Sequence, residues 1–480
     1  MKHWYPISPL LFKQSDEPAF CQALAPRWGR MGCRRGSPVP GHAPREKPHS
    51  GSARAPGPGG TDRMDVAGPL VRAAVRAGNA AGRALRSLGV APGPFEAQAL
   101  IERARRATGL DDLGADEIRE PLDVLLRSLH AEGRLTLVGR IAARQDLQSL
   151  LAERLRLRAD RQRHPQIAAE RIVRPLFIVG LPRTGSTLLH HLLAQDEASR
   201  VAQAWEIMAP SPPPEQERYA SDPRIRRAAR RLRFMDRLAP EFKTIHPLGS
   251  QLPLECIAIM SYALLSPRFH TTYHTPSYQR WLARQDLRPA YELHRRVLQH
   301  LQWRAPAGRW VLKAPSHLWA FDTLFGVYPD ALVVQTHRDP VTVLASVASL
   351  TAVLQGAFAE DLDMAEIGDE VTERWTTGLE RALAARRLLP EERFVDVHYR
   401  DLVRDPLGVV QRIYRAFGLP LTGRTRERMA RFLADSARDR RAPHVYSLRT
   451  FGLDAGDLAH RFEAYREHFD IPAERPGGDA

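Results

Sequence analysis

The stretch LFIVGLPRTGSTLLHHLL, residues 176–193, constrains this chain more than any other part of it. A short run of β-branched and aromatic residues meets a glycine-containing turn, and an apolar, leucine-rich segment follows. This order predicts a strand, a tight loop and a helix, which is the context in which glycine-rich loops bind phosphates. Gly180 would end the strand, Pro182 would stiffen the turn, and Gly185 would let the backbone pass close to a ligand. The first amides of the helix would then point at an anion.

The loop departs from that of nucleotide-hydrolysing P-loop enzymes. Their pattern G-x-x-x-x-G-K-[ST] would place a lysine at position 186, where this chain has Ser186. The cation lies inside the turn instead, as Arg183, whose planar guanidinium suits phosphate or sulfate oxygens. The segment VVQTHRDP contains Asp339 near its end, but the adjacent Arg338 makes this carboxylate a poor magnesium ligand. We therefore expect the loop to bind an anion without a metal, through Arg183, Thr184, Gly185, Ser186 and Thr187.

After residue 170, short apolar runs alternate with amphipathic helical stretches, which is typical of βαβ units. The expected strands are residues 176–179, 310–313, 331–336 and 393–397. The block 201–309 between the first two strands is expected to be a helical and loop-like insertion over one edge of the sheet. Residues 171–472 are thus predicted to form an α/β domain with a P-loop-like central parallel sheet flanked by helices.

The two ends of the chain have different patterns. Residues 1–63 are rich in Pro, Gly, Ser and Arg and lack helical or strand periodicity, so we expect a disordered or non-native extension. Residues 64–170 contain several amphipathic stretches, the first of them ending on Gly89, which predicts a helical N-terminal region without catalytic residues. Residues 473–480 are expected to be a flexible tail.

Charge and cysteine content limit the partners and the compartment. Of the formal net charge of +15, +6 lies in residues 1–63, and the remaining arginines are spread along helices beside glutamates. Basic residues interleaved with aromatics are missing, so we expect no nucleic acid partner but attraction of an anionic small molecule. Three cysteines predict a reducing cytoplasm. No apolar run approaches the ~20 residues of a membrane span, and the best candidate, 252–265, contains Glu255.

Several segments together resemble the sulfotransferase family, in particular its bacterial members with a P-R-T/S-G-S/T-T loop. PLFIVGLPRTGSTLLHHLL resembles the family's 5′-phosphosulfate loop. LVVQTHRDPVTVLASVASL resembles its second motif, in which a strand delivers an arginine and a serine follows eight positions later, as Arg338 and Ser346 do. WVLKAPSHLW is similar to the strand–lysine segment, and VHYRDLVRDP to the Y-x-D-L stretch. VYSLRTFGLD and YREHFDIP are similar to the C-terminus of this group, so that the resemblance covers residues 95–472.

The resemblance implies an enzyme that depends on 3′-phosphoadenosine 5′-phosphosulfate (PAPS) as the donor. It would move a sulfuryl group from 3′-phosphoadenosine 5′-phosphosulfate to a hydroxyl or amine of a small molecule or biopolymer, with no metal. Arg338 and Ser346 would hold the 3′-phosphate, and Tyr399 would lie near the adenine. Arg183 would be the main cation on the leaving group, and Lys313, one of two lysines after residue 63, would act on the bridging oxygen or the sulfonate.

Two residues compete as the base that takes the acceptor's proton. Glu206 lies 23 positions after Arg183, about where some sulfotransferases have a catalytic glutamate; His317 lies four after Lys313, near the position of the histidine of cytosolic members. The alternatives are a helix-capping or exposed glutamate and a polar histidine at a helix start. We prefer Glu206, because Trp205 and the following prolines could shield it.

Two other functions stay open: a P-loop-type kinase acting on a small molecule, which Ser186 disfavours, and a catalytically inactive nucleotide-binding module. The acceptor is not defined by the sequence. His270 and His274 have a metal-ligand spacing but no third ligand nearby, so lining an acceptor pocket is the preferred interpretation. The aromatic residues of block 201–309 would either line this pocket or pack in the core; they are Trp205, Phe242, Tyr262, Phe269, Tyr273 and Trp281.

Overall fold

The computed structural model of the chain describes residues 67–89, 93–238, 249–305, 308–438 and 447–474. The predicted N-terminal extension, residues 1–63, lies outside the described residues. So do Phe242 and residues 475–480 of the predicted tail.

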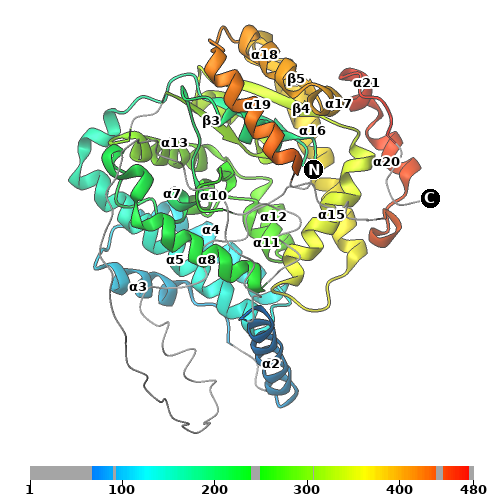
Figure 1. Cartoon of the computed structure of the whole chain (residues 1–480). Coiled ribbons are helices and arrows are strands. Elements are labelled where there is room, and N and C mark those ends of the chain that lie inside the picture. Colours follow the sequence, from blue (N-terminus) through cyan, green and yellow to red (C-terminus); the bar gives the residue numbers. More distant parts are fainter. Residues whose placement is uncertain (1–66, 90–92, 239–248, 306–307, 439–446, 475–480) are drawn as a thin grey trace, which may run out of the picture.

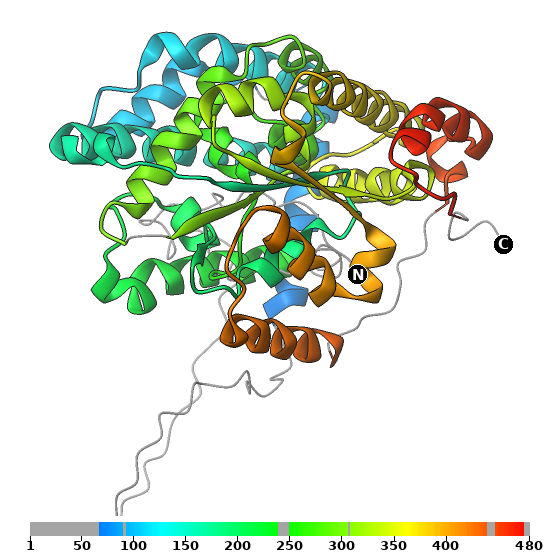
Figure 2. The ribbon, with the colours of Figure 1, turned by 90° about the horizontal axis from the view of Figure 1, so that it is seen from above.

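A five-stranded parallel sheet lies at the centre of the molecule (Figures 1 and 2), in the order β2-β3-β1-β4-β5. Four strands fall within one residue of the predicted bounds: β1 (Leu176–Gly180), β3 (Arg309–Lys313), β4 (Leu332–His337) and β5 (Phe394–His398). The edge strand β2 (Ser199–Arg200) is too short to be recognised from its sequence pattern. The predicted α/β class with a P-loop-like parallel sheet is confirmed.

Helices cover both faces of the sheet (Figure 2), which explains why its strands are nearly continuous hydrophobic runs. Along β1, Leu176 and Ile178 enter one hydrophobic cluster, while Phe177 and Val179 enter the other. The first face is covered by α6 (Ser186–Leu193), α18 (Pro406–Ala416) and α19 (Gly423–Arg438). The second is covered by α13 (Arg288–Gln302), α14 (Phe321–Val327), α15 (Pro340–Gly356) and α16 (Met364–Arg386).

The predicted helical N-terminal region consists of α2 (Ala67–Ser87), α3 (Ala97–Thr108), α4 (Ala115–Ala131), α5 (Leu137–Arg163) and η1 (Pro165–Ala169). Its helices share one hydrophobic cluster with the sheet, in which Leu147 of α5 and Phe177 of β1 both take part. A buried ion pair between Asp146 of α5 and Arg268 adds to this contact, with Nη2 and Oδ2 3.1 Å apart. Residue 170 therefore does not separate two hydrophobic cores.

The block between β2 and β3 is helical, as expected. It contains α7 (Ala204–Met208), η2 (Gln216–Ser221), α8 (Pro223–Leu238), α10 (Cys256–Met260), η3 (Ser261–Ala263), α11 (Arg268–Thr272) and α12 (Pro276–Leu282) before α13. Trp205, Tyr262, Phe269 and Tyr273 are all buried in the core, and Trp281 packs partly buried against it. These aromatic side chains are packing residues, which is the second of the two expected roles.

The remaining elements follow the last three strands. They are η4 (Pro315–Trp319), η5 (Glu391–Arg393), α17 (Tyr399–Arg404), η6 (Arg449–Phe451), α20 (Ala455–Arg461) and α21 (Glu463–His468). Helices α20 and α21 lie at the periphery beyond α15 and α16 (Figure 1, red). Across the described ranges, no helix combines the length and the apolar character needed to cross a membrane.

Candidate active site

The carboxyl ends of four strands bring the predicted site residues to one edge of the sheet. Strand β1 lies between β3 and β4, so the chain leaves it in one direction for β2 and β3 and returns on the other side for β4 and β5. In open α/β sheets, ligands bind at the carboxyl edge where this order reverses. The loop 181–185 follows β1, Lys313 ends β3, Arg338 follows β4 and Tyr399 follows β5.

The loop after β1 is packed tightly against its neighbours at two glycines. Gly180 has φ +148° and pairs with Thr336 of β4, whose atoms a Cβ would strike. Gly185 has φ +85°, and a Cβ there would lie 2.7 Å from Leu402 and 3.3 Å from Tyr399. The loop can therefore pass between β4 and α17 only because both positions are glycine.

Arg183 is held in a strained conformation in this loop, with φ +68°. A left-handed backbone costs a side-chain-bearing residue roughly 1–2 kcal/mol, and such strain gathers at functional sites. The guanidinium thus stands where glycine would be the relaxed choice. This observation supports the expected role of Arg183 as a cation of the loop.

The three hydroxyls of the loop have different surroundings. Thr184 Oγ1 donates to Leu181 O at 2.7 Å and lies 2.6 Å from Thr336 Oγ1, so this hydroxyl braces the loop against β4. Thr187 Oγ1 accepts from Lys313 Nζ at 3.1 Å. Ser186 Oγ is buried and has no hydrogen-bond partner in the part of the chain described. A buried hydroxyl of this kind at the first residue of α6 suits an anionic ligand.

Lys313 forms a buried ion pair that the sequence did not predict. Its Nζ contacts Glu255 Oε1, and both side chains are 2% exposed. The other carboxylate oxygen, Glu255 Oε2, is buried without a hydrogen-bond partner among the described residues. Burial raises the pKa of Glu255 above its ordinary value, while the Lys313 ammonium opposes this shift. The pair thus places a cation beside the loop, together with a carboxylate oxygen, Glu255 Oε2, that can still accept a hydrogen bond.

The second predicted anion site adjoins the first. Arg338 Nη1 donates to Arg183 O at 3.3 Å, and the Arg338 guanidinium lies 4.2 Å from the centroid of the Tyr399 ring. The arginine after β4, the tyrosine after β5 and the loop after β1 therefore meet at one place. The residues of the two predicted anion sites thus lie side by side, as a nucleotide with both a 3′- and a 5′-phosphate would require.

Ser346 extends this second site along α15. Asp339 caps the helix by accepting from Val341 N, and Ser346 lies seven residues further, on the same face as Asp339 and Thr342. Ser346 is largely buried at this position. Because Ser346 follows Arg338 by eight residues, it lies about two turns into α15, the helix that begins just after Arg338.

Glu206 has contacts that favour the capping role. Its Oε1 pairs with Arg200 Nη2 at 2.5 Å, and its Oε2 accepts from Gln203 N at 2.9 Å, which completes a capping box at α7. The side chain is fully buried. Because both oxygens are engaged within the protein, the geometry argues against Glu206 as the base.

His317 lies in the core below the loop. Its Nδ1 is 2.6 Å from Tyr291 Oη, and its ring meets Phe177 of β1 edge-on. Burial, with a smaller effect of His294, lowers the pKa of His317 well below its ordinary value. His317 is thus a neutral core histidine at ordinary pH, and its contacts favour a structural role.

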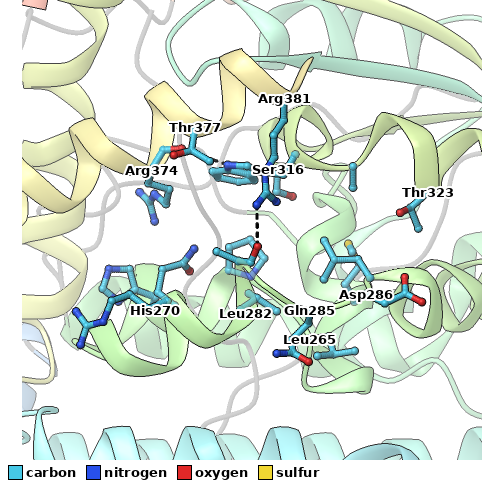
Figure 3. Close-up of a pocket in the computed structure, with 18 of the residues that line it drawn as sticks. Leu265, His270, Leu282, Gln285, Asp286, Ser316, Thr323, Arg374, Thr377 and Arg381 are labelled. Atoms are coloured by element: carbon cyan, nitrogen blue, oxygen red, sulfur yellow. Dashed lines mark hydrogen bonds between the residues drawn. The ribbon is translucent and has the colours of Figure 1, made fainter. Parts of the chain in front are cut away.

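A cavity of about 300 Å³ adjoins η4 on the side facing α16 (Figure 3). In Figure 3, Arg374, Thr377 and Arg381 of α16 face His270, Leu282 and Gln285 from the opposite side, and Arg381 Nη2 donates to Ala283 O at 3.0 Å. The lining mixes charged and apolar groups and includes Met260, Ser316, Trp319 and Glu370. His270 lines this cavity, with its Nε2 3.0 Å from Glu370 Oε2, whereas His274 does not line it. Within the described ranges, no cluster of three or more His, Cys, Asp or Glu could hold a metal ion.

The family model of the sulfotransferase family matches residues 175–423, which include the loop, Lys313, Arg338 and Tyr399. The chain therefore belongs to the sulfotransferase family.

Solved structures support the same assignment. The chain is 36% identical to sulfotransferase STF1 from Mycobacterium tuberculosis, with a TM-score of 0.67, over 77% of this chain and 99% of that one. It is 31% identical to sulfotransferase STF9 from Mycobacterium avium, with a TM-score of 0.72, over 80% of this chain and all of that one. It is also 28% identical to the omega-hydroxy-beta-dihydromenaquinone-9 sulfotransferase Stf3 of Mycobacterium bovis, over 55% of this chain and 67% of Stf3.

Proposed function

We propose that the protein transfers a sulfuryl group from 3′-phosphoadenosine 5′-phosphosulfate to a hydroxyl, or an amine, of its acceptor. The donor's 5′-phosphate would bind at the loop, on Arg183, Ser186 and the first amides of α6. Its 3′-phosphate would bind Arg338 and Ser346. The link from Arg338 to the Arg183 carbonyl supports this placement, because it brings the two anion sites within reach of one nucleotide.

The observation that carries the proposed chemistry is the buried Lys313–Glu255 pair beside the loop. The acceptor oxygen would attack sulfur, the bond from sulfur to the bridging phosphate oxygen would break, and the acceptor's proton would pass to Glu255 Oε2. Lys313 and Arg183 would neutralise the charge that develops on the bridging oxygen. The raised pKa of Glu255 suits this task, because a base is most effective when its pKa approaches the working pH.

The pair also links removal of the acceptor's proton to stabilisation of the leaving phosphate. Once Glu255 has taken the proton, it no longer carries the charge that balances Lys313. The ammonium is then available to the leaving phosphate at the moment when that group becomes more negative. We therefore assign the role of base to Glu255 in place of Glu206 and His317.

The acceptor would approach from the cavity beside η4. Met260 and Ser316 line it, and each is close to the catalytic pair along the chain: Met260 ends the helix that Glu255 precedes, and Ser316 lies three residues after Lys313. Gln279 Oε1 and Ser316 Oγ at this cavity are buried and lack partners in the described structure, which favours a polar acceptor. A volume of about 300 Å³ is at the lower end of the range for small-molecule sites. It would hold the head of an acceptor, with any long chain remaining outside.

The test is sulfuryl transfer from the ³⁵S-labelled donor to a sugar, a phenol and a hydroxylated lipid, with wild type and Glu255→Gln. We expect transfer to at least one acceptor and a loss of about 100-fold or more in the variant. Glu153→Gln is the matched control, since Glu153 is also buried, ion-paired and raised in pKa by burial, but lies in α5. Its turnover should stay near that of wild type.

The two alternatives give different results in this assay. An inactive binding module would bind adenosine 3′,5′-bisphosphate but transfer nothing to any acceptor. A kinase would consume ATP with magnesium and ignore the sulfonucleotide. Full activity of Glu255→Gln would refute the assignment of Glu255 as the base, but it would not affect the proposed donor site.

A further inference from the structure

The C-terminal segment of the described chain docks on the second anion site. Glu474 forms a forked ion pair with Arg338: its Oε2 lies 3.0 Å from Nε and 2.9 Å from Nη2. Glu474 N donates to Asp339 Oδ2 at 2.7 Å, and Thr342 Oγ1 donates to Glu474 O at 3.5 Å. Glu474, which lies in the predicted tail, thus contacts three residues at the far end of β4 and the start of α15, while residues 475–480 lie outside the described residues.

The segment leading to Glu474 is firmly anchored. Tyr465 Oη lies 2.7 Å from His337 Nδ1, and the Phe469 ring stacks on His337 with centroids 4.1 Å apart. Ile471 is buried in the main core. Three residues then span the distance from the core to Arg338. Only these three residues therefore need to move for the carboxylate to leave the guanidinium.

The group that Glu474 presents is an anion with paired oxygens, and a phosphate would bind the Arg338 fork through the same kind of contact. The pair is only partly buried, with side chains 18% and 22% exposed, so water can replace either partner at modest cost. The Lys313–Glu255 pair is buried more deeply, with both side chains 2% exposed, so water reaches it less easily. A phosphate could therefore replace the Glu474 carboxylate on Arg338 more easily than any group could separate Lys313 from Glu255.

We propose that the Glu474 carboxylate stands in for the donor's 3′-phosphate: it gives up Arg338 when the nucleotide binds and takes it back when the product leaves. This inference rests on the proposed donor site. Glu474 then lowers the affinity for every nucleotide with a 3′-phosphate, the product included. It keeps the arginine paired between turnovers and helps to expel adenosine 3′,5′-bisphosphate.

The test is calorimetric titration with adenosine 3′,5′-bisphosphate of wild type, Glu474→Gln and Glu467→Gln. Glu467 is the matched control, because it is an exposed glutamate of the same C-terminal segment. We expect Glu474→Gln to bind this nucleotide about three- to fivefold tighter than wild type, the worth of a partly exposed ion pair. Glu467→Gln should bind like wild type. Adenosine 5′-phosphate, which lacks the 3′-phosphate, should bind all three proteins equally.

A second measurement separates displacement from simple charge repulsion. Hydrogen exchange of the Glu474 amide should accelerate when adenosine 3′,5′-bisphosphate binds wild type, because this amide then leaves Asp339 Oδ2. Weaker binding by Glu474→Gln would overturn the inference and make Glu474 a positioning residue for Arg338. Unchanged binding, or unchanged exchange, would also overturn it. Failure of every variant to bind the nucleotide would instead remove the donor site itself, and this inference with it.

Discussion

Replacing Lys313 by methionine, alone and together with Glu255→Gln, separates the structural from the chemical role of the buried pair. The single change leaves the Glu255 carboxylate without its counter-charge at a site that is 2% exposed. Breaking such a pair costs about 3–5 kcal/mol. Protonation of Glu255, whose pKa burial already raises, recovers part of this cost. We expect the free energy of unfolding to fall by about 2–4 kcal/mol at neutral pH.

The double variant removes both charges and leaves a neutral amide beside the thioether. Its stability should return to within about 1–2 kcal/mol of wild type, because no buried charge is left unpaired. Its turnover should remain at least about 100-fold lower, because the cation and the base are both gone. Urea unfolding followed by tryptophan fluorescence and the ³⁵S-transfer assay measure the two quantities. Recovery of turnover along with stability would refute the assignment of chemistry to this pair.

Three further changes test other parts of the site and fold. Arg183→Gly should relieve the left-handed backbone and stabilise the protein by up to about 1 kcal/mol, yet lower turnover by about 100-fold; unaltered turnover would remove Arg183 from the reaction. Arg338→Ala should weaken binding of adenosine 3′,5′-bisphosphate by about 1.5–3 kcal/mol in calorimetry, while adenosine 5′-phosphate should bind as before. Burial lowers the pKa of His294 to about 3, so the unfolded chain takes up a proton at this residue first and stability is lost as pH falls from about 6.5 towards 3. His294→Phe should therefore reduce the loss of unfolding free energy between pH 7 and pH 5 by about 2 kcal/mol; an unchanged loss would contradict this.

The features that the sequence predicted well are local ones. Residues 176–193 combine a buried strand, two glycines and a leucine-rich helix. The conformation of the loop is therefore determined by residues that are close in sequence. Arg338 and Ser346 are likewise joined by one strand end and one helix. The four longer strands are largely apolar runs, whereas β2 consists of Ser199 and Arg200 alone and carries too little pattern to be recognised.

The proposed base was harder to predict because its partner is distant in sequence. Glu255 lies 58 positions before Lys313, and its only local signal is that it interrupts the apolar run 252–265. A single acid in such a run is rarely buried without a partner, and this could have pointed to an ion pair. Glu206, by contrast, follows Gln203 at the spacing of a capping box, a local signal for the structural role that its contacts show.

Glu474 illustrates a second limit. A short polar end with proline and glycine predicts disorder, and nothing within residues 473–480 indicates where the chain would dock. Its position depends on Tyr465 and Phe469, which pack on His337 at the end of β4. Only the tertiary structure brings that strand end and this carboxylate together.

The central claim is that the two neighbouring anion sites hold one nucleotide. A crystal structure with adenosine 3′,5′-bisphosphate tests it most directly. We predict the 5′-phosphate at Ser186 and the amides that open α6, the 3′-phosphate on Arg338 and Ser346, and Glu474 moved away from the guanidinium. A nucleotide that occupies only one of these sites, or places its 3′-phosphate elsewhere while Glu474 stays on Arg338, would contradict the account.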